Sequence, residues 1–138
     1  MIQFNYETNF KLQNEEVLKN WISTCIDSHG FKEGELNYIF CNDEYLLKLN
    51  IEFLNHDTFT DILSFDYTLG KLVGGDIFIS IDRVKDNANK FSQHIDNELN
   101  RVMIHGVLHF MGYQDKTAEE KVLMRNEEDR CLILLKSR

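Results

Sequence analysis

Residues 105–115 read His-Gly-Val-Leu-His-Phe-Met-Gly-Tyr-Gln-Asp, a stretch that places two histidines before a glycine and an aspartate after it. His105 and His109 are four residues apart, so on a helix they share one face, with Cβ atoms about 5–6 Å apart. Gly112 suits a left-handed turn that ends the helix and carries Asp115 back towards the histidines. The spacing predicts that His105, His109 and Asp115 bind one divalent metal ion and leave a position open to water.

Two alternatives stay open for this stretch. Histidines at this spacing also occur on helices without a metal, where the rings pack or form hydrogen bonds, and Asp115 can instead cap the helix expected near Thr117. The residue after His105 is Gly106, at the position where zinc peptidases of the His-Glu-x-x-His type carry their general base. A peptidase is therefore disfavoured, whereas hydrolysis of other bonds stays open because a bound divalent ion acidifies water.

The segments around this stretch predict an α+β fold in a single domain of residues 1–138, with a mixed sheet of about four strands. Strands are expected at 2–7, 36–41, 61–67 and 75–81, and the short connection 68–74 predicts an antiparallel hairpin. Apolar stripes and capping residues predict helices from Asn14 to Gly30, from Asn42 or Asp43 to about 53, at 82–91, at 95–111 and from Thr117 to about 136. The sheet is expected to back the metal-bearing helix, as in zincin-like metallohydrolases.

The composition excludes several classes of protein. The chain has 138 residues, of which 43 % are hydrophobic and 28 % charged, and its net charge is −8. No apolar run approaches the roughly 20 residues that cross a bilayer, and the N-terminus lacks the features of a signal peptide. Three cysteines without close pairing argue against a disulfide scaffold. We therefore expect a cytoplasmic protein with no membrane partner, which can bind nucleic acid only through a locally positive groove.

Several motifs in a fixed order resemble the YbeY family, bacterial metal-dependent endoribonucleases that mature ribosomal RNA. Residues 105–115 resemble the family's His-Gly-x-Leu-His-Leu-x-Gly-Tyr-Asp-His, and residues 75–77 resemble its Gly-Asp-Ile strand. Leu49-Asn50, followed by Thr-Asp-Ile-Leu-Ser-Phe at 60–65, resembles the family's Leu-Asn and Thr-Asp-Val-Leu-Ser-Phe block. The likeness spans about residues 36 to 135, and the combination of motifs is more specific than any one of them.

The resemblance implies a single-strand-specific metallo-endoribonuclease of ribosomal RNA maturation and ribosome quality control. Its partners would be single-stranded RNA, ribosomal RNA and the ribosome or ribosomal proteins, and its cofactor one divalent ion, with zinc favoured. The resemblance places Thr60, Asp61 and Ser64 in the substrate cleft and gives Asp76 a catalytic role, as a carboxylate that orients a ligating histidine. On the residues alone, the first three also suit the entry of a strand, and Asp76 suits a turn.

Two positions depart from the family pattern. The family's third ligand is usually a histidine, whereas Asp115 is a harder ligand that makes Mn²⁺ or another divalent ion more plausible. The family also places an arginine where this chain has Leu54, and His56 and Lys48 are the nearby substitutes. Two other functions therefore stay open: a metal-dependent hydrolase of small phosphoesters or amides, and a non-catalytic ribosome-associated module that binds metal for stability.

Overall fold

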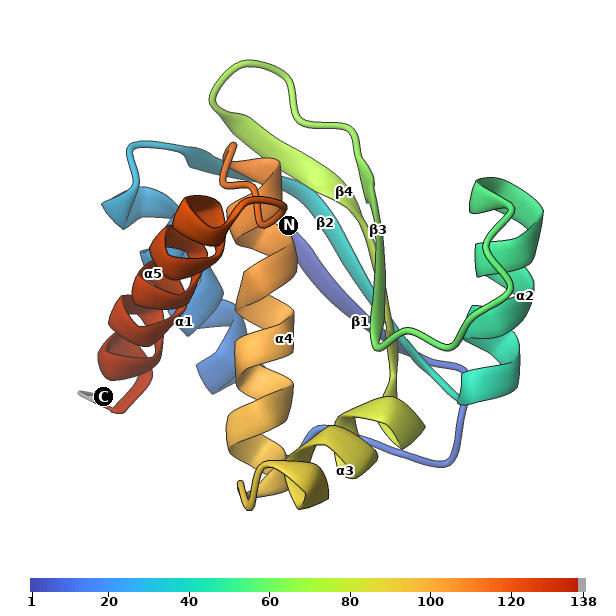
Figure 1. Cartoon of the computed structure of the whole chain (residues 1–138). Helices are drawn as coiled ribbons and strands as arrows, with labels where there is room; N and C mark the ends of the chain where they lie inside the picture. Colours follow the sequence, from blue (N-terminus) through green and yellow to red (C-terminus); the bar gives the residue numbers. More distant parts are fainter. Residues whose placement is uncertain (137–138) are drawn as a thin grey trace.

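One mixed sheet of four strands organises the structure, a computed structural model that describes residues 1–136 (Figure 1). The strands are β1 (Ile2–Tyr6), β2 (Lys32–Cys41), β3 (Ile62–Asp66) and β4 (Leu72–Ser80). Their spatial order is β1-β2-β4-β3, in which β2 runs parallel to β1 and β4, and β3 runs antiparallel to β4. The predicted mixed sheet and the predicted hairpin are both confirmed.

Five helices pack around this sheet: α1 (Glu15–Ser28), α2 (Asp43–Leu54), α3 (Ile81–Lys90), α4 (Ile95–Phe110) and α5 (Ala118–Lys136). Helices α1 and α4 bury their apolar residues against one face of the sheet, where the Tyr38 hydroxyl donates to the Met103 carbonyl at 2.8 Å. Helix α5 lies outside them, and the Trp21 indole N–H donates to the Cys131 carbonyl at 2.6 Å. Helix α2 covers the other face through a small cluster that includes Leu46 and Leu63. The α+β architecture is therefore as predicted.

Helix α4 packs closely against the sheet because glycines occupy the positions where the helix and the sheet meet. A Cβ on Gly106 would lie 2.9 Å from the Ile77 Cδ1 atom. A Cβ on Gly75 would lie 2.4 Å from the Phe65 carbonyl oxygen and 2.7 Å from the Phe110 ring. Gly106 thus faces the sheet, and packing alone excludes a glutamate there. His105 and His109 lie on the neighbouring, partly exposed side of the helix.

The strand boundaries differ from the predicted ones at the start of β2 and β4. Both strands begin earlier, because Lys32 pairs with Leu72 and Glu33 pairs with Val73. The register shifts between Glu33 and Leu36, around Gly34. Because this part of β2 consists of polar residues and glycine, the hydrophobic pattern of the sequence does not indicate it.

The helix starts show one further difference. The Asn14 side chain forms no capping hydrogen bond, so the expected side-chain cap of α1 is wrong. The Asn42 side chain does cap α2, by accepting from the Tyr45 N–H at 2.9 Å.

The connection between α4 and α5 is held at both ends. Gly112 has a φ of +102°, as the expected left-handed turn requires. The Thr117 hydroxyl accepts from the Glu120 N–H at 3.1 Å, and the Glu120 carboxylate accepts from the Thr117 N–H at 2.9 Å. This pair is the predicted capping box, and it fixes the start of α5.

The structure also bears on the cysteines and on the apolar character of the helices. Cys25, Cys41 and Cys131 are buried, and none of the three is joined in a disulfide. Within residues 1–136, no helix combines the length and the apolar character that crossing a membrane requires.

We predict that Gly75→Ala lowers the free energy of unfolding by about 2–4 kcal/mol, because the new Cβ would overlap backbone of the neighbouring strand. Gly70→Ala is the control, since Gly70 also has a positive φ (+59°) but a Cβ there meets nothing within 4 Å. Its cost should stay near 1 kcal/mol, from backbone strain alone. Urea unfolding followed by circular dichroism measures both, and equal losses would contradict the close-approach explanation.

Candidate metal centre

His105, His109 and Asp115 come together at the C-terminal end of α4. The two histidine Nε2 atoms lie 3.0 Å apart. The Asp115 Oδ2 atom lies 3.2 Å from the Nε2 atom of His105 and 3.4 Å from that of His109. These three side chains each offer one ligand atom, and the three atoms lie within 4.8 Å of one another. The structure therefore brings together the three residues that the sequence singles out.

The turn after α4 delivers Asp115 to the histidines. The Gly112 N–H donates to the His109 carbonyl and the Tyr113 N–H donates to the Leu108 carbonyl, both at 3.0 Å, so the chain reverses at once. The hydroxyl that caps α5 belongs to Thr117. The Asp115 carboxylate faces the two histidines instead of serving as that cap.

A buried glutamate of α5 supports His105 from behind. The His105 Nδ1 atom lies 2.6 Å from the Glu128 Oε2 atom, and Glu128 is 5 % exposed. Because an ionised carboxylate only accepts hydrogen bonds, Nδ1 carries the proton and donates it. The Nε2 lone pair of His105 is thereby directed at the cluster, as metal-ligating histidines require.

Glu128 is in turn held by an arginine. The Arg101 guanidinium donates to Glu128 at 2.9 Å and to Asp129 at 2.7 Å. The sequence analysis missed Glu128, although a signal was present. It stands between Met124 and Cys131 on the apolar stripe of α5, and a charged residue at such a position needs a buried partner.

Acidic groups dominate the electrostatics around His105. Burial alone would lower the pKa of His105, but the hydrogen bond and charge of Glu128, together with the charges of Asp115 and Asp61, raise it above its ordinary value. Burial also raises the pKa of the Asp61 carboxyl, against the opposing charge of His105. Positive charge is thus favoured at this place, whether a proton or a metal cation supplies it.

A cavity of about 320 Å³ opens beside the cluster. It lies where the start of β3 faces α4 and α5, and substrate or water can reach the cluster through it. Its lining residues are Asp61, Ile62, Glu98, Arg101, Val102, His105, Asp115, Arg125 and Glu128.

The predicted substrate-binding residues differ in their relation to this cavity. Asp61 lines it together with His105 and Asp115. Thr60 donates its hydroxyl to the Ile62 carbonyl at 3.3 Å, within its own strand entry. Ser64 is exposed and, two residues after Ile62, points to the same side of β3, but it is not among the lining residues. The structure thus places Asp61 in the cavity at the cluster, whereas Thr60 and Ser64 do not line that cavity.

Asp76 lies away from the cluster. It precedes Ile77, which contacts α4, so its side chain points to the opposite face of the sheet. There it accepts from the Asn37 side-chain amide at 3.1 Å. The carboxylate that orients His105 is Glu128, and a catalytic role for Asp76 stays a prediction.

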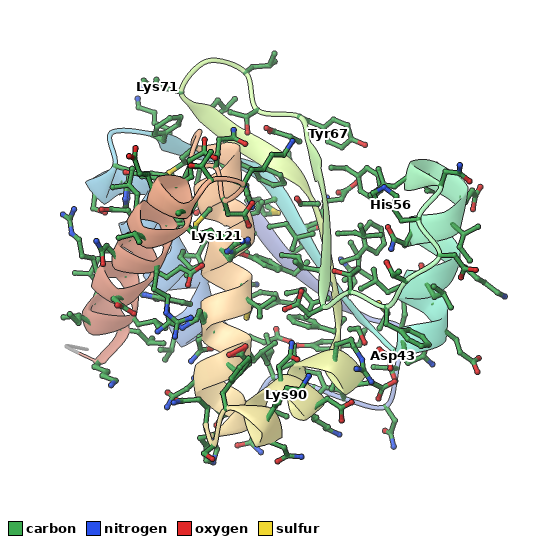
Figure 2. All side chains as sticks on the ribbon, in the orientation of Figure 1. Asp43, His56, Tyr67, Lys71, Lys90 and Lys121 are labelled. Carbon is green, nitrogen blue, oxygen red and sulfur yellow. The ribbon has the colours of Figure 1, made fainter. Side chains whose placement is uncertain are left out.

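The position where this chain has Leu54 in place of the family arginine does not line the cavity either. Leu54 is the last residue of α2 and is 46 % exposed. Figure 2 shows His56 beside α2. Neither Leu54 nor the suggested substitutes, His56 and Lys48, line the cavity at the cluster, where Arg101 and Arg125 are the cations.

The donor set fits a divalent metal ion. Two imidazole nitrogens and one carboxylate oxygen are ligands that zinc and Mn²⁺ both accept, and the cavity leaves room for water beside them. The Glu128 carboxylate behind His105 is the outer hydrogen-bond partner typical of such sites.

Comparisons with known proteins agree with one another. The family model described as endoribonuclease YbeY matches residues 2–136. A protein of Flavobacterium johnsoniae named endoribonuclease YbeY is 56 % identical, over 94 % of this chain and 93 % of its own length. A protein of Karelsulcia muelleri with the same name is 44 % identical, over 100 % of this chain and 98 % of its own length. A solution structure from Thermotoga maritima shares the fold, with a TM-score of 0.70 at 24 % identity, covering 98 % of this chain and 89 % of that one.

We predict that Glu128→Gln weakens the binding of Zn²⁺ or Mn²⁺ by about tenfold or more, because an amide is a weaker acceptor than the carboxylate that holds His105. Glu127→Gln is the matched control: Glu127 is also buried, but it contacts His29 at 2.8 Å and not His105. Chelator competition on folded protein gives both affinities. An unchanged affinity in Glu128→Gln would contradict the supporting role of this residue.

Proposed function

The chain belongs to the endoribonuclease YbeY family, and we propose that it cleaves single-stranded RNA at the cluster of His105, His109 and Asp115 with a bound divalent metal ion. Family membership makes it an endoribonuclease, a hydrolase that acts on RNA. One observation carries the assignment of the site: the three ligand atoms lie within 4.8 Å of one another, and His105 and Asp115 line a cavity that Arg101 and Arg125 also line.

Each residue of the cluster has a separate task. His105, oriented by Glu128, and His109 offer neutral nitrogen ligands, and Asp115 adds a negative charge that offsets part of the charge of the cation. A divalent ion held there supplies Lewis acidity, which acidifies water and offsets charge on a phosphodiester. We propose zinc as the resident ion, with Mn²⁺ as the alternative that the carboxylate ligand favours.

The walls of the cavity fit hydrolysis of a phosphodiester better than hydrolysis of a peptide. Gly106 packs against Ile77 and leaves no place for the general base of zinc peptidases. Arg101 and Arg125 line the cavity, and guanidinium groups bind phosphate well. Asp61 lies in the same cavity, so among the predicted substrate-binding residues it is the one we place in contact with the substrate.

We further propose that the RNA is ribosomal and that the protein acts in the cytoplasm beside the ribosome. The motif resemblance supports this role in ribosomal RNA maturation and ribosome quality control. Unprocessed ribosomal RNA ends in a deletion strain would support the proposal, and normal ends would count against it.

We predict that purified protein loaded with Zn²⁺ or Mn²⁺ cleaves a single-stranded RNA oligomer and that a chelator abolishes the cleavage. Casein should stay intact, because the peptidase base is missing. Two rival functions give other results. Cleavage of a small phosphoester or amide substrate without cleavage of RNA would favour a different hydrolase. If no metal supported any cleavage while chelation lowered the melting temperature, a non-catalytic metal-binding module would be favoured.

We predict that Asp115→Ala loses tenfold or more in metal affinity and loses RNA cleavage with it, since losing a ligand should cost at least as much as losing a partner of a ligand. Asp115→His should retain binding and shift the preference towards zinc, because imidazole is the softer ligand. Calorimetric titration of both variants with Zn²⁺ and Mn²⁺ measures these effects. Unaltered affinities in both would remove Asp115 from the ligand set.

A further inference from the structure

A second cavity, of about 340 Å³, follows the seam between α4 and α5. It shares Glu98, Arg101 and Arg125 with the cavity at the metal cluster, so the two cavities adjoin. Figure 1 shows α4 and α5 side by side, with the end of α3 beside the start of α4. We call the second cavity the seam groove; its lining residues are Phe91, Gln93, Asn97, Glu98, Asn100, Arg101, Arg125, Leu132, Leu135 and Lys136.

Basic residues outnumber acidic ones along the seam groove. Arg101, Arg125 and Lys136 line it, and Glu98 is its one acid within the described part of the chain. Burial raises the pKa of Glu98, and the charges of Arg101 and Arg125 oppose that rise. In a protein with a net charge of −8, this is the kind of locally positive groove that RNA binding requires.

Arg125 is the cation of this groove that is best placed to take a ligand. Arg101 is already engaged by Glu128 and Asp129, whereas Arg125 is exposed and has no ion-pair partner within residues 1–136. Arg125 also lines the cavity that contains His105 and Asp115. A free guanidinium at that junction matches a phosphate close to the reacting one.

The far end of the seam groove has a different chemistry. Phe91, the residue that ends α3, is 62 % exposed. An exposed ring along a positive groove suits stacking on an unpaired base, and the amides of Asn97 and Asn100 between the two ends can donate and accept hydrogen bonds. Phosphate, base and amide contacts along one groove fit single-stranded RNA.

We propose that the seam groove is a binding track for single-stranded RNA, in which Arg125 binds a phosphate next to the cleaved bond and Phe91 stacks on a base farther along the strand. The proposal rests on the proposed function, because the groove starts at the metal cluster. It adds a path for the substrate, from the cluster along the α4–α5 seam to the end of α3, and it makes Arg125 a substrate-binding residue.

Binding to the metal-free protein tests the track separately from catalysis. A fluorescent single-stranded RNA of about 12 nucleotides, in the range of site sizes known for such grooves, is titrated in chelator at several salt concentrations and followed by anisotropy. Arg125→Ala should weaken binding about three- to tenfold and lower the slope of log K against log salt by about 0.7, the value for one lost phosphate contact on a single strand. Arg125→Lys should keep the slope.

Lys121→Ala is the matched control, because Lys121 lies on the same helix one turn before Arg125 and lines neither cavity. It removes the same charge and should change affinity by less than about twofold, as expected of a solvated charge. Equal losses in Lys121→Ala and Arg125→Ala would show a diffuse charge effect and overturn the assigned track.

The length of the RNA tests the far end. Phe91→Ala should weaken the binding of the RNA of about 12 nucleotides about fivefold or more and leave that of an RNA of about 4 nucleotides unchanged, since a short strand held at Arg125 does not reach the ring. Equal effects on both lengths, or none on either, would remove Phe91 from the track.

Different results would refute the RNA track and the proposed function. Arg125→Ala with wild-type affinity and salt slope would overturn the track even if the metal-loaded enzyme cleaves RNA. Failure of the wild-type protein to cleave RNA with any metal would overturn the proposed function. In that case, salt-dependent binding lost specifically in Arg125→Ala would still support the groove as an RNA-binding surface.

Discussion

The close contact of α4 with β3 and β4 is the constraint on which the rest of the structure depends. Gly75 and Gly106 let the helix approach the sheet, since a Cβ at Gly75 would overlap the Phe110 ring of α4 and a Cβ at Gly106 would overlap Ile77 of β4. A helix seated in this way has one face committed to the core, so the neighbouring, partly exposed side, which carries His105 and His109, is held in a fixed orientation. The contact that stabilises the fold therefore also positions the proposed metal ligands.

A second layer of contacts turns this orientation into a usable site. The Gly112 turn brings the Asp115 carboxylate within 3.4 Å of both histidine Nε2 atoms, and Glu128 holds the other ring nitrogen of His105. Each ligand is thus fixed by something other than the metal, by the helix, the turn or the buried carboxylate. Such preorganisation would let a small protein bind an ion without reordering its chain.

The charges are arranged to separate two tasks. Acidic groups gather at the cluster, where they favour a cation, and positive groups gather along the α4–α5 seam, where a polyanion would lie. Arg101 stands between the two regions, with its guanidinium held by Glu128 and Asp129. In a chain of net charge −8, this arrangement is what the proposed RNA track would require.

The sequence by itself determined the features that depend on neighbours along the chain. The histidine spacing, the Gly112 turn and the capping box at Thr117 are local, and from them the ligand trio, the helix and the α+β order followed. Only the tertiary structure decided contacts between distant segments: Glu128 reaches His105 across 23 residues, Arg125 joins a groove made by two helices, and Asp76 faces away from the cluster. The early start of β2 was hidden for the same reason, because it depends on pairing with β4. A pattern along one segment shows which side chains share a face, but which faces meet is decided by how the segments pack.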